Sequence, residues 1–462
     1  MWADAFRRIH PSSLSILSFP SSPLPMPYST DTRTLQPGDV YVAIRGETHD
    51  GHAFIPQAVA KGAAGVVTAV DVAPDVAGAA EVIRVDDTLR YLIEQAIAKV
   101  RRQAPAIVAI TGSVGKTTTR TAVHAVLSET FEVVASVGNM NTPLGLSLLL
   151  LNRDFGPQTK LVLEMGARLE GDIRELCSYF PPTVALVTNV KGVHVETFGS
   201  IDGVAREKSE LVRALGPTGT ACLNGDDPRV RAMAALHTGP TLLYGLDPRC
   251  DVGPDRITAT LPMLGAHAVY TALAAMSVGL ALGMDEATIN RGLAQIKPEK
   301  GRLNRLRGRG GTTLIDDSYN ASPDATRAAL DVLRTHAAAR RVAFLGDMLE
   351  LGATEIEAHA GVLEAAVEAA DEVHAVGPLM ARAVATLPTE VQARISTHAT
   401  AADVAEALDA GRLYMPAEGD VVLVKGSQGI RMERVAAALL HPDLDPAVVL
   451  PRQSESWQQV QG

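Results

Sequence analysis

The fold is decided by the stretch Ala106-Ile-Val-Ala-Ile-Thr-Gly-Ser-Val-Gly-Lys-Thr-Thr-Thr119. Its first five residues are apolar or small and predict a buried strand, and the residues from Lys116 onward predict a helix. Glycines between them allow the backbone to approach an anion closely. Together these features predict a phosphate-binding loop, with Lys116 on the phosphate and the Thr117 hydroxyl on a magnesium ion. The expected nucleotide-binding residues are Thr111, Gly112, Ser113, Val114, Gly115, Lys116, Thr117 and Thr118.

The loop has the short pattern T-G-x-x-G-K-T, because Ile110 stands where a longer motif has its first glycine. An ordinary strand-to-helix turn that happens to carry Lys and Thr is the alternative interpretation. The apolar strand before the loop and the helical pattern after it favour phosphate binding.

Composition bounds the class of protein. A length of 462 residues suggests about three domains. A net charge of −10 argues against a general nucleic-acid or anionic-membrane binder. The three cysteines form no C-x-x-C pair, which fits a reducing cytosol, and no apolar run approaches the ~20 residues that span a bilayer. We therefore expect a cytoplasmic protein without membrane insertion, whose residues 1–28 are irregular.

The pattern of strands and helices predicts an α/β protein with three domains. Residues 1–103 form a small N-terminal α/β domain, with an alternating strand at 38–44 and a helix at about 88–102. Residues 104–297 form the central domain, in which strands at 106–111, 131–136, 161–165, 184–190 and 220–224 alternate with helices. This alternation predicts a doubly wound parallel sheet carrying the phosphate loop.

The third predicted domain, residues 298–462, is Rossmann-like, with strands at 312–317, 341–347, 372–377 and 420–425. Glycines between Gly301 and Gly311 predict a linker, and the tail after Pro451 is expected to be loose.

Polar residues follow the central strands where ligands of a parallel sheet gather. Glu164 ends one strand, Thr188 and Asn189 end another, and His194 follows in a loop. Glu164 is a suitable hard oxygen ligand for the ion at Thr117. Alone, a loop histidine and a helix lysine such as Lys208 usually face water. Their position after strand ends beside the phosphate loop indicates a functional role.

With these segments the chain resembles the Mur ligases, ATP-dependent amino-acid ligases of cell-wall precursor synthesis. The matching segments are the phosphate loop, Gly138-Asn-Met-Asn-Thr-Pro-Leu-Gly145, Glu164-Met-Gly166, Thr188-Asn-Val190 with His194, Phe198-Gly-Ser200, Glu207-Lys208-x-Glu210 and Asn224-Gly-Asp-Asp-Pro228. The resemblance implies a carbamylated lysine at Lys208 and two Mg²⁺ ions. One ion would lie at Thr117 and Glu164, and the other at His194 and Lys208.

The C-terminal segments resemble the member of this family that adds D-alanyl-D-alanine to UDP-N-acetylmuramoyl-tripeptide (UDP-MurNAc-tripeptide). These segments are Asp316-Asp-Ser-Tyr-Asn-Ala-Ser-Pro323, Leu345-Gly-Asp-Met-Leu-Glu-Leu-Gly352, Val424-Lys-Gly-Ser427 and Arg431-Met-Glu433. The implied reaction consumes ATP and passes through an acyl phosphate. The family is mostly monomeric, so a monomer is expected.

The resemblance also implies roles for individual residues. The expected catalytic residues are Lys116, His194, Lys208 and Arg302, and Arg302 would also clamp the nucleotide. Asp317 would hold the ribose, and Asn139 or His267 would lie near adenine. The expected substrate residues are Ser29, Asp31, Arg33, Asp50, Gly51, His52, Asn141, Thr142, Tyr319, Asn320, Lys425 and Ser427. For Asp347 and Glu350, helix capping or plain solvation serves equally well.

One departure from the family pattern concerns adenine recognition, because Ala268 and Thr271 replace the usual asparagines. The alternatives are therefore a folylpolyglutamate synthase, a diamino-acid-adding Mur ligase, or a non-catalytic nucleotide-binding relative. A GTPase is disfavoured because Asn189-Val-Lys191 is not the guanine-reading Asn-Lys-x-Asp.

Overall fold

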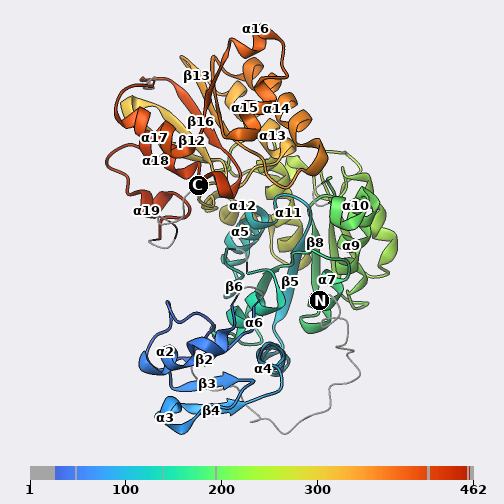
Figure 1. Ribbon diagram of the computed structural model, residues 1–462. Coiled ribbons are helices and arrows are strands. Elements are labelled where there is room, and N and C mark those ends of the chain that lie inside the picture. The colour runs from blue at the N-terminus through green and yellow to red at the C-terminus, as the bar shows by residue number, and fades with distance from the viewer. Residues whose placement is uncertain are drawn as a thin grey trace. The chain divides into compact units, whose positions relative to one another are not determined.

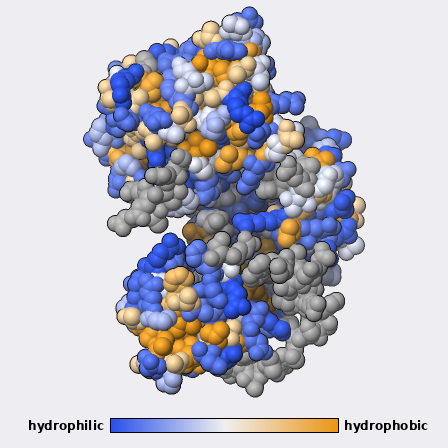
Figure 2. Space-filling model, viewed as in Figure 1, coloured by the Kyte–Doolittle hydropathy of each residue, from blue (hydrophilic) through white to orange (hydrophobic). Residues whose placement is uncertain are grey.

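The computed structural model describes residues 27–46, 49–138, 140–192, 195–413, 417–454 and 457 (Figure 1). The chain divides into two compact units, residues 1–256 with 274–289 and residues 257–273 with 290–462. In the described ranges, no helix is both long and apolar enough to cross a membrane. The face drawn in Figure 2 is largely hydrophilic, with smaller hydrophobic areas.

The first unit begins with a four-stranded parallel sheet in the order β1-β2-β3-β4. Its strands are Tyr28–Ser29, Val40–Val42, Gly65–Thr68 and Glu81–Arg84. Its helices are η2 (Gly51–Phe54), α2 (Ile55–Ala60), α3 (Pro74–Ala77) and α4 (Thr88–Gln103).

The expected alternation of buried and exposed residues in the strand at 38–44 was wrong. All three residues of β2 are buried. Val40 and Val42 belong to one hydrophobic cluster, whereas Tyr41 and Ala43 belong to another. Both faces of this small sheet are covered, so no face is left for polar side chains.

The central sheet of the first unit is six-stranded and parallel, in the order β10-β9-β8-β5-β7-β6. Its strands are β5 (Ala106–Thr111), β6 (Val133–Ala135), β7 (Lys160–Glu164), β8 (Val184–Val187), β9 (Thr220–Asn224) and β10 (Thr241–Tyr244). The doubly wound parallel sheet is therefore confirmed. Only β10, a partly exposed edge strand, was not predicted.

Helices connect these strands and follow them. They are α5 (Lys116–Leu127), α6 (Pro143–Leu151), α7 (Asp172–Tyr179), α8 (Val195–Phe198), α9 (Ile201–Arg213), α10 (Pro228–Ala232), η3 (Met233–Leu236), η4 (Pro254–Arg256), α11 (His267–Ala281) and α12 (Glu286–Ala294). The chain passes from one unit to the other within α11 and α12.

The second unit contains a six-stranded sheet in the order β11-β12-β16-β13-β14-β15. Its strands are β11 (Asn304–Arg307), β12 (Thr313–Asp317), β13 (Arg341–Gly346), β14 (Glu372–Val376), β15 (Ile395–His398) and β16 (Val421–Lys425). Five strands run parallel, but β11 is antiparallel to β12, so the sheet is mixed. The predicted linker at 301–311 thus contains an edge strand.

Two hydrophobic clusters cover the faces of this sheet. The surrounding helices are α13 (Pro323–Thr335), α14 (Glu355–Ala369), α15 (Pro378–Val384), α16 (Thr389–Gln392), α17 (Ala401–Asp409), α18 (Glu433–Leu439) and α19 (Pro446–Val449), with short helices η5 (Arg309–Gly311), η6 (Gly352–Thr354) and η7 (Gln428–Ile430).

Candidate functional site

The turn between β5 and α5 is shaped by two glycines. Gly112 has φ +148°, and a Cβ at this position would collide with Thr188 Oγ1. Gly115 has φ +82° and is the N-cap of α5. Both positions need a residue without a side chain, because these backbone angles are unfavourable for other residues. The turn delivers Lys116, Thr117 and Thr118 to the first turn of α5, where free N–H groups favour an anion.

The end of β8 braces this loop. The backbone N–H of Ser113 donates to the Asn189 carbonyl (3.0 Å), and that of Val114 donates to Asn189 Oδ1 (3.0 Å). Thr188 Oγ1 donates to the Val114 carbonyl at 2.8 Å. Sequence reasoning gave Ser113 and Val114 to the phosphate, but in this structure their N–H groups bind Asn189. Asn189 was recognised as part of a motif, but its bracing role was missed.

Lys116 closes over the loop. Its Nζ donates to the carbonyls of Gly112 (2.7 Å) and Ser113 (3.2 Å). An arriving phosphate would compete with these carbonyls for the ammonium.

Thr117 and Glu164 meet as expected for two hard oxygen ligands. Thr117 Oγ1 donates to Glu164 Oε2 at 3.0 Å, and Asn141 Nδ2 donates to Glu164 Oε1 at 3.2 Å. Arg120 Nη1 lies 3.7 Å from the same carboxylate, an ion pair that the sequence did not reveal. Hydroxyl and carboxylate oxygens fit Mg²⁺, which usually takes one or two carboxylates and completes its shell with water and phosphate. The described residues contain no group of three His, Cys, Asp or Glu side chains that could hold a metal without such help.

Lys208 is buried on α9, with only 4% of its surface exposed. Burial and the nearby Lys116 charge lower the pKa of Lys208 to about 8. Its Nζ lies 6.0 Å from the centre of the Phe198 ring, and the described part of the chain offers it no hydrogen-bond or ion-pair partner. Near neutral pH a substantial fraction of this amine is therefore uncharged and nucleophilic.

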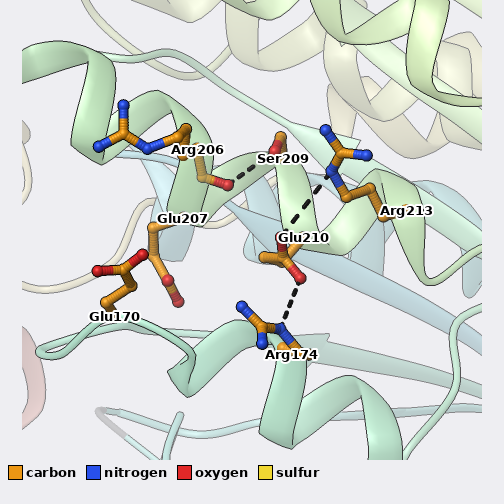
Figure 3. Close-up of a pocket in the computed structure, with 7 residues that line it drawn as sticks. All are labelled: Glu170, Arg174, Arg206, Glu207, Ser209, Glu210 and Arg213. Carbon is orange, nitrogen blue, oxygen red and sulfur yellow. Dashed lines mark hydrogen bonds and ion pairs between the residues drawn. The ribbon is translucent and has the colours of Figure 1, made fainter.

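The neighbouring Glu207 has a structural role. Its two carboxylate oxygens accept the backbone N–H groups of Gly171 (2.7 Å) and Ile173 (2.8 Å), at the start of α7. Figure 3 shows the pocket that this residue helps to line, a cavity of about 280 Å³ between α7 and α9. Its charges are balanced, and Glu210 joins Arg174 (2.9 Å) to Arg213 (3.9 Å). None of the predicted site residues lines it.

The N-terminal substrate segment is held by local bonds. Arg33 and Asp31 form a bidentate ion pair, with Nη2 2.7 Å from Oδ2. Ser29 Oγ donates to the Asp31 carbonyl at 3.1 Å. The Arg33 hydrogen bond is the main cause of the lowered pKa of Asp31. Because the Arg33 side chain is 77% exposed, it can exchange this partner for a ligand anion at small cost.

His52 has both ring nitrogens occupied. Its Nε2 accepts the backbone N–H of Ala69 (2.9 Å), so Nδ1 must carry the proton that it shares with Asp50 Oδ1 (2.5 Å). Hydrogen bonds from His52 lower the pKa of Asp50 to about 2. Gly51 leaves no room for a side chain, because a Cβ would lie 2.6 Å from the Ile44 carbonyl oxygen. His52 therefore positions this loop and has no free nitrogen for a substrate.

In the second unit, the carboxyl ends of β12 and β16 carry a buried ion pair. Lys425 Nζ donates to Asp317 Oδ2 (2.5 Å) and to the Asn320 carbonyl (3.0 Å). Asp317 Oδ1 accepts the Leu303 N–H at 3.1 Å. Burial lowers the pKa of His267, while Asp317 raises it and Lys425 lowers it. The structure thus brings His267, Asp317 and Lys425 into one electrostatic neighbourhood.

Asp316 differs sharply from the adjacent Asp317. It is fully buried, and burial raises its pKa to about 7. Its Oδ1 accepts the Ser318 hydroxyl at 2.6 Å. This carboxyl is a structural group at the base of the loop that carries Tyr319.

Ser427 and Asp347 hold neighbouring loops. Ser427 Oγ accepts the Leu349 N–H at 2.9 Å. Asp347 accepts the N–H groups of Leu379 (3.1 Å) and Met380 (2.8 Å), so the capping interpretation of Asp347 is confirmed.

Arg302 lies over the Tyr319 ring, with 4.2 Å between its guanidinium carbon and the ring centre. From the C-terminal tail, Arg452 donates to the carbonyls of Tyr319 (2.9 Å) and Ser318 (2.5 Å) and to Glu433 (3.0 Å). Glu433 also accepts Arg431 Nε. The expectation of a loose tail after Pro451 was therefore wrong at Arg452, because buried charges must be paired.

Comparison with known proteins identifies the family. Three family models match in succession, described as Mur ligase family, catalytic domain (residues 28–106), Mur ligase middle domain (110–279) and Mur ligase, glutamate ligase domain (301–428). The chain belongs to the Mur ligase family. The three models together span most of the chain and separate at the boundaries between the three sheets.

Relatives of this Mur ligase carry the name UDP-N-acetylmuramoyl-tripeptide--D-alanyl-D-alanine ligase. That of Bacillus subtilis is 30% identical and the match covers 90% of this chain and 93% of the relative. That of Escherichia coli is 33% identical, with 89% and 93% covered. That of Mycobacterium tuberculosis is 34% identical, with 89% and 92% covered.

Solved structures agree with this placement. MurF from Acinetobacter baumannii superposes with a TM-score of 0.77 at 29% identity, over 89% of this Mur ligase and 92% of that chain. MurF from Thermotoga maritima in complex with ADP gives 0.76 at 28%, over 89% and 96%. A folylpolyglutamate synthase from Mycobacterium tuberculosis shares the fold alone, at 17% identity and a TM-score of 0.55 over 76% and 93%.

Two predicted site residues of this Mur ligase, Asn139 and His194, lie outside the described residues. The second Mg²⁺ ligand set is therefore described only through Lys208. Conversely, sequence reasoning missed Arg120 and Arg452 as contacts of site residues, because each finds its partner far along the chain.

Proposed function

We propose that this Mur ligase joins D-alanyl-D-alanine to UDP-MurNAc-tripeptide, with ATP converted to ADP and phosphate. The supporting observation is the similarity over nine tenths of the chain to ligases named for this reaction. The ADP complex of the Thermotoga relative supports ATP as the nucleotide.

In the proposed reaction, the terminal carboxylate of the tripeptide attacks the γ-phosphate of ATP and ADP leaves. The amine of D-alanyl-D-alanine then attacks the acyl carbon of the acyl phosphate, and phosphate leaves. The loop from Thr111 to Thr118 would hold the nucleotide phosphates, with Lys116 neutralising their charge. Two Mg²⁺ ions would neutralise the charge that develops between the attacking carboxylate and the phosphates.

Thr117 and Glu164 would hold one of these ions, and His194 with a carbamylated Lys208 the other. The lowered pKa of Lys208 supports the carbamate, because only a neutral amine reacts with carbon dioxide. The amine nitrogen attacks the carbon of carbon dioxide and loses one proton to solvent. An anionic oxygen then replaces a cation at a metal position.

Further roles belong to each unit separately. In the first unit, Ser29, Asp31 and Arg33 would bind the nucleotide sugar, with Asp50, Gly51 and His52 shaping their loop, while Asn141 and Thr142 would contact the peptide. In the second unit, Arg302 would clamp phosphate, and Asp317 with His267 would face the nucleoside. Tyr319, Asn320, Lys425 and Ser427 would line the acceptor site.

The proposal includes three functional domains, residues 1–103, 104–297 and 298–462, acting within a monomer in the cytoplasm. Asn139 belongs to the proposed nucleotide site as well.

The test is product formation. The protein is incubated with ATP, Mg²⁺, UDP-MurNAc-tripeptide and D-alanyl-D-alanine, while phosphate release is followed and the nucleotide product is weighed by mass spectrometry. We expect UDP-MurNAc-pentapeptide and phosphate in equal amounts, only when both substrates are present. A Lys116→Met variant serves as the matched control for contaminating ligase. Product from UDP-MurNAc-dipeptide and a diamino acid instead would overturn the assignment.

A further inference from the structure

Helix α6 connects two parts of the proposed donor site. Its N-cap is Thr142, whose hydroxyl accepts the Gly145 N–H at 3.3 Å. Asn141, one residue earlier, donates to Glu164. At the other end, the helix stops at Asn152, whose backbone N–H donates to the Leu148 carbonyl. Nine residues at 1.5 Å each make this helix about 14 Å long.

Asn152 binds the strand from which the N-terminal substrate segment departs. Its Oδ1 accepts the backbone N–H of Tyr28 at 2.7 Å, and its Nδ2 donates to the Tyr28 carbonyl at 2.8 Å. The side-chain amide thus pairs with both backbone groups of one residue, as a neighbouring strand would. Tyr28 is the first residue of β1, and Ser29 follows directly.

The helix is held firmly between these ends. Leu146, Leu149 and Leu150 are buried in the main cluster of the first unit. Lys99, from α4, donates to the carbonyls of Leu151 (3.2 Å) and Arg153 (2.6 Å), beyond the last turn of α6. A cation at this end stabilises the helix through its dipole. The spacing between Asn141 and Tyr28 is therefore set by a rigid, packed element.

We propose that α6 is a fixed spacer for the donor substrate and that Asn152 is the positioning residue that sets its length. This inference rests on the proposed function. A donor that carries its nucleotide sugar at one end and its reacting carboxylate at the other must reach both ends of α6. When two anchor points are held at a matched distance, binding at one raises the effective concentration at the other. Release of β1 from Asn152 weakens the long donor, but not fragments that use one anchor point.

The test compares Asn152→Ala with wild type, using donor KM, kcat, and the Kd of UDP-MurNAc as a fragment lacking the peptide. We expect the KM for UDP-MurNAc-tripeptide to rise about 10-fold, a small part of the gain that linked binding can give. The kcat, the KM for ATP and the Kd of UDP-MurNAc should stay within about 2-fold of wild type. A merely structural defect would move all four values or none.

Lys99→Met is the matched control, because it removes a bond to the end of α6 and leaves the pairing of Asn152 with Tyr28 in place. It should lower the melting temperature without raising the donor KM. If Asn152→Ala fails to fold, Asn152→Asp replaces it, since a carboxylate retains the acceptor for the Tyr28 N–H but repels the Tyr28 carbonyl. An unchanged donor KM, or an equal loss of fragment affinity, would overturn the inference. A wild type that forms no pentapeptide product would overturn the proposed function instead.

Discussion

Two buried lysines, one in each unit, have opposite surroundings. Lys208 is 4% exposed and Lys425 is 2% exposed. Lys425 is paired with Asp317 and donates to the Asn320 carbonyl. Lys208 faces the Phe198 ring and the charge of Lys116, and its pKa falls to about 8. Burial alone therefore does not decide what a lysine does, since a counter-ion keeps one as a structural cation and the lack of a described one prepares the other for chemistry.

The largest expected effect concerns catalysis at Lys208. We expect Lys208→Ala to lower kcat about 10³-fold, the size of loss seen when one charge-stabilising group is removed. Lys208→Arg should fail as well, because a guanidinium stays charged and cannot take up carbon dioxide. Short carboxylates such as acetate should restore part of the Lys208→Ala rate. Steady-state kinetics of the three proteins, with Lys425→Arg as control, would break the comparison if both arginine variants kept equal activity.

The second prediction concerns the stability of the Lys425 pair. Lys425→Met should lower the free energy of unfolding by about 3–5 kcal/mol, because Asp317 is left charged and buried. Urea titration measures this loss. The double variant Lys425→Met with Asp317→Asn should recover part of it, whereas strictly additive losses would show that the two side chains are not coupled.

The third prediction has the opposite sign. In buffer free of carbon dioxide at pH 7, Lys208→Met should raise the free energy of unfolding by up to about 3 kcal/mol, the equivalent of the pKa difference between 10.5 and about 8. The unfolded lysine holds its proton up to pH 10.5, and the folded one releases it near pH 8. Wild-type stability should therefore rise relative to the variant between pH 8 and 10.5 and stay level below pH 8. Urea titrations across this range check the slope, and a falling difference on the acid side would contradict it.

The smallest expected effect concerns Ser427, near Lys425. Ser427→Ala removes the acceptor of the Leu349 N–H and should cost about 1 kcal/mol. Thermal unfolding measures the loss. Ser427→Thr, which keeps the hydroxyl, is the matched control. A loss as large as that of Lys425→Met would mean that this loop, and not the ion pair, holds the second site together.

The sequence was sufficient wherever function depends on neighbouring residues. The phosphate loop follows from a buried strand, two glycines and a helix start that are contiguous, and the meeting of Thr117 with Glu164 follows from the strand-end rule for parallel sheets. The edge strands β10, β11 and β15 were missed because partly exposed strands lack a continuous apolar run.

Contacts between distant residues could not be predicted in this way. Asn189 occupies two N–H groups of the phosphate loop from 75 residues away, and no local pattern announces it. His52 was expected to contact substrate, but its tautomer is fixed by Asp50 and the Ala69 N–H. The same holds for Asn152 and Tyr28, which are 124 residues apart.

The anchoring of Arg452 has a consequence for the order in which the protein is made. Its bond to the Tyr319 carbonyl joins residues 133 positions apart. At roughly 5–20 residues per second, a ribosome would deliver Arg452 on the order of 7–27 seconds after Tyr319. During that interval the nascent chain has the loop without its brace. Messages that end early, or ribosomes that stall in the last few codons, would therefore release a chain that is folded in most respects but whose Tyr319 loop is unfinished.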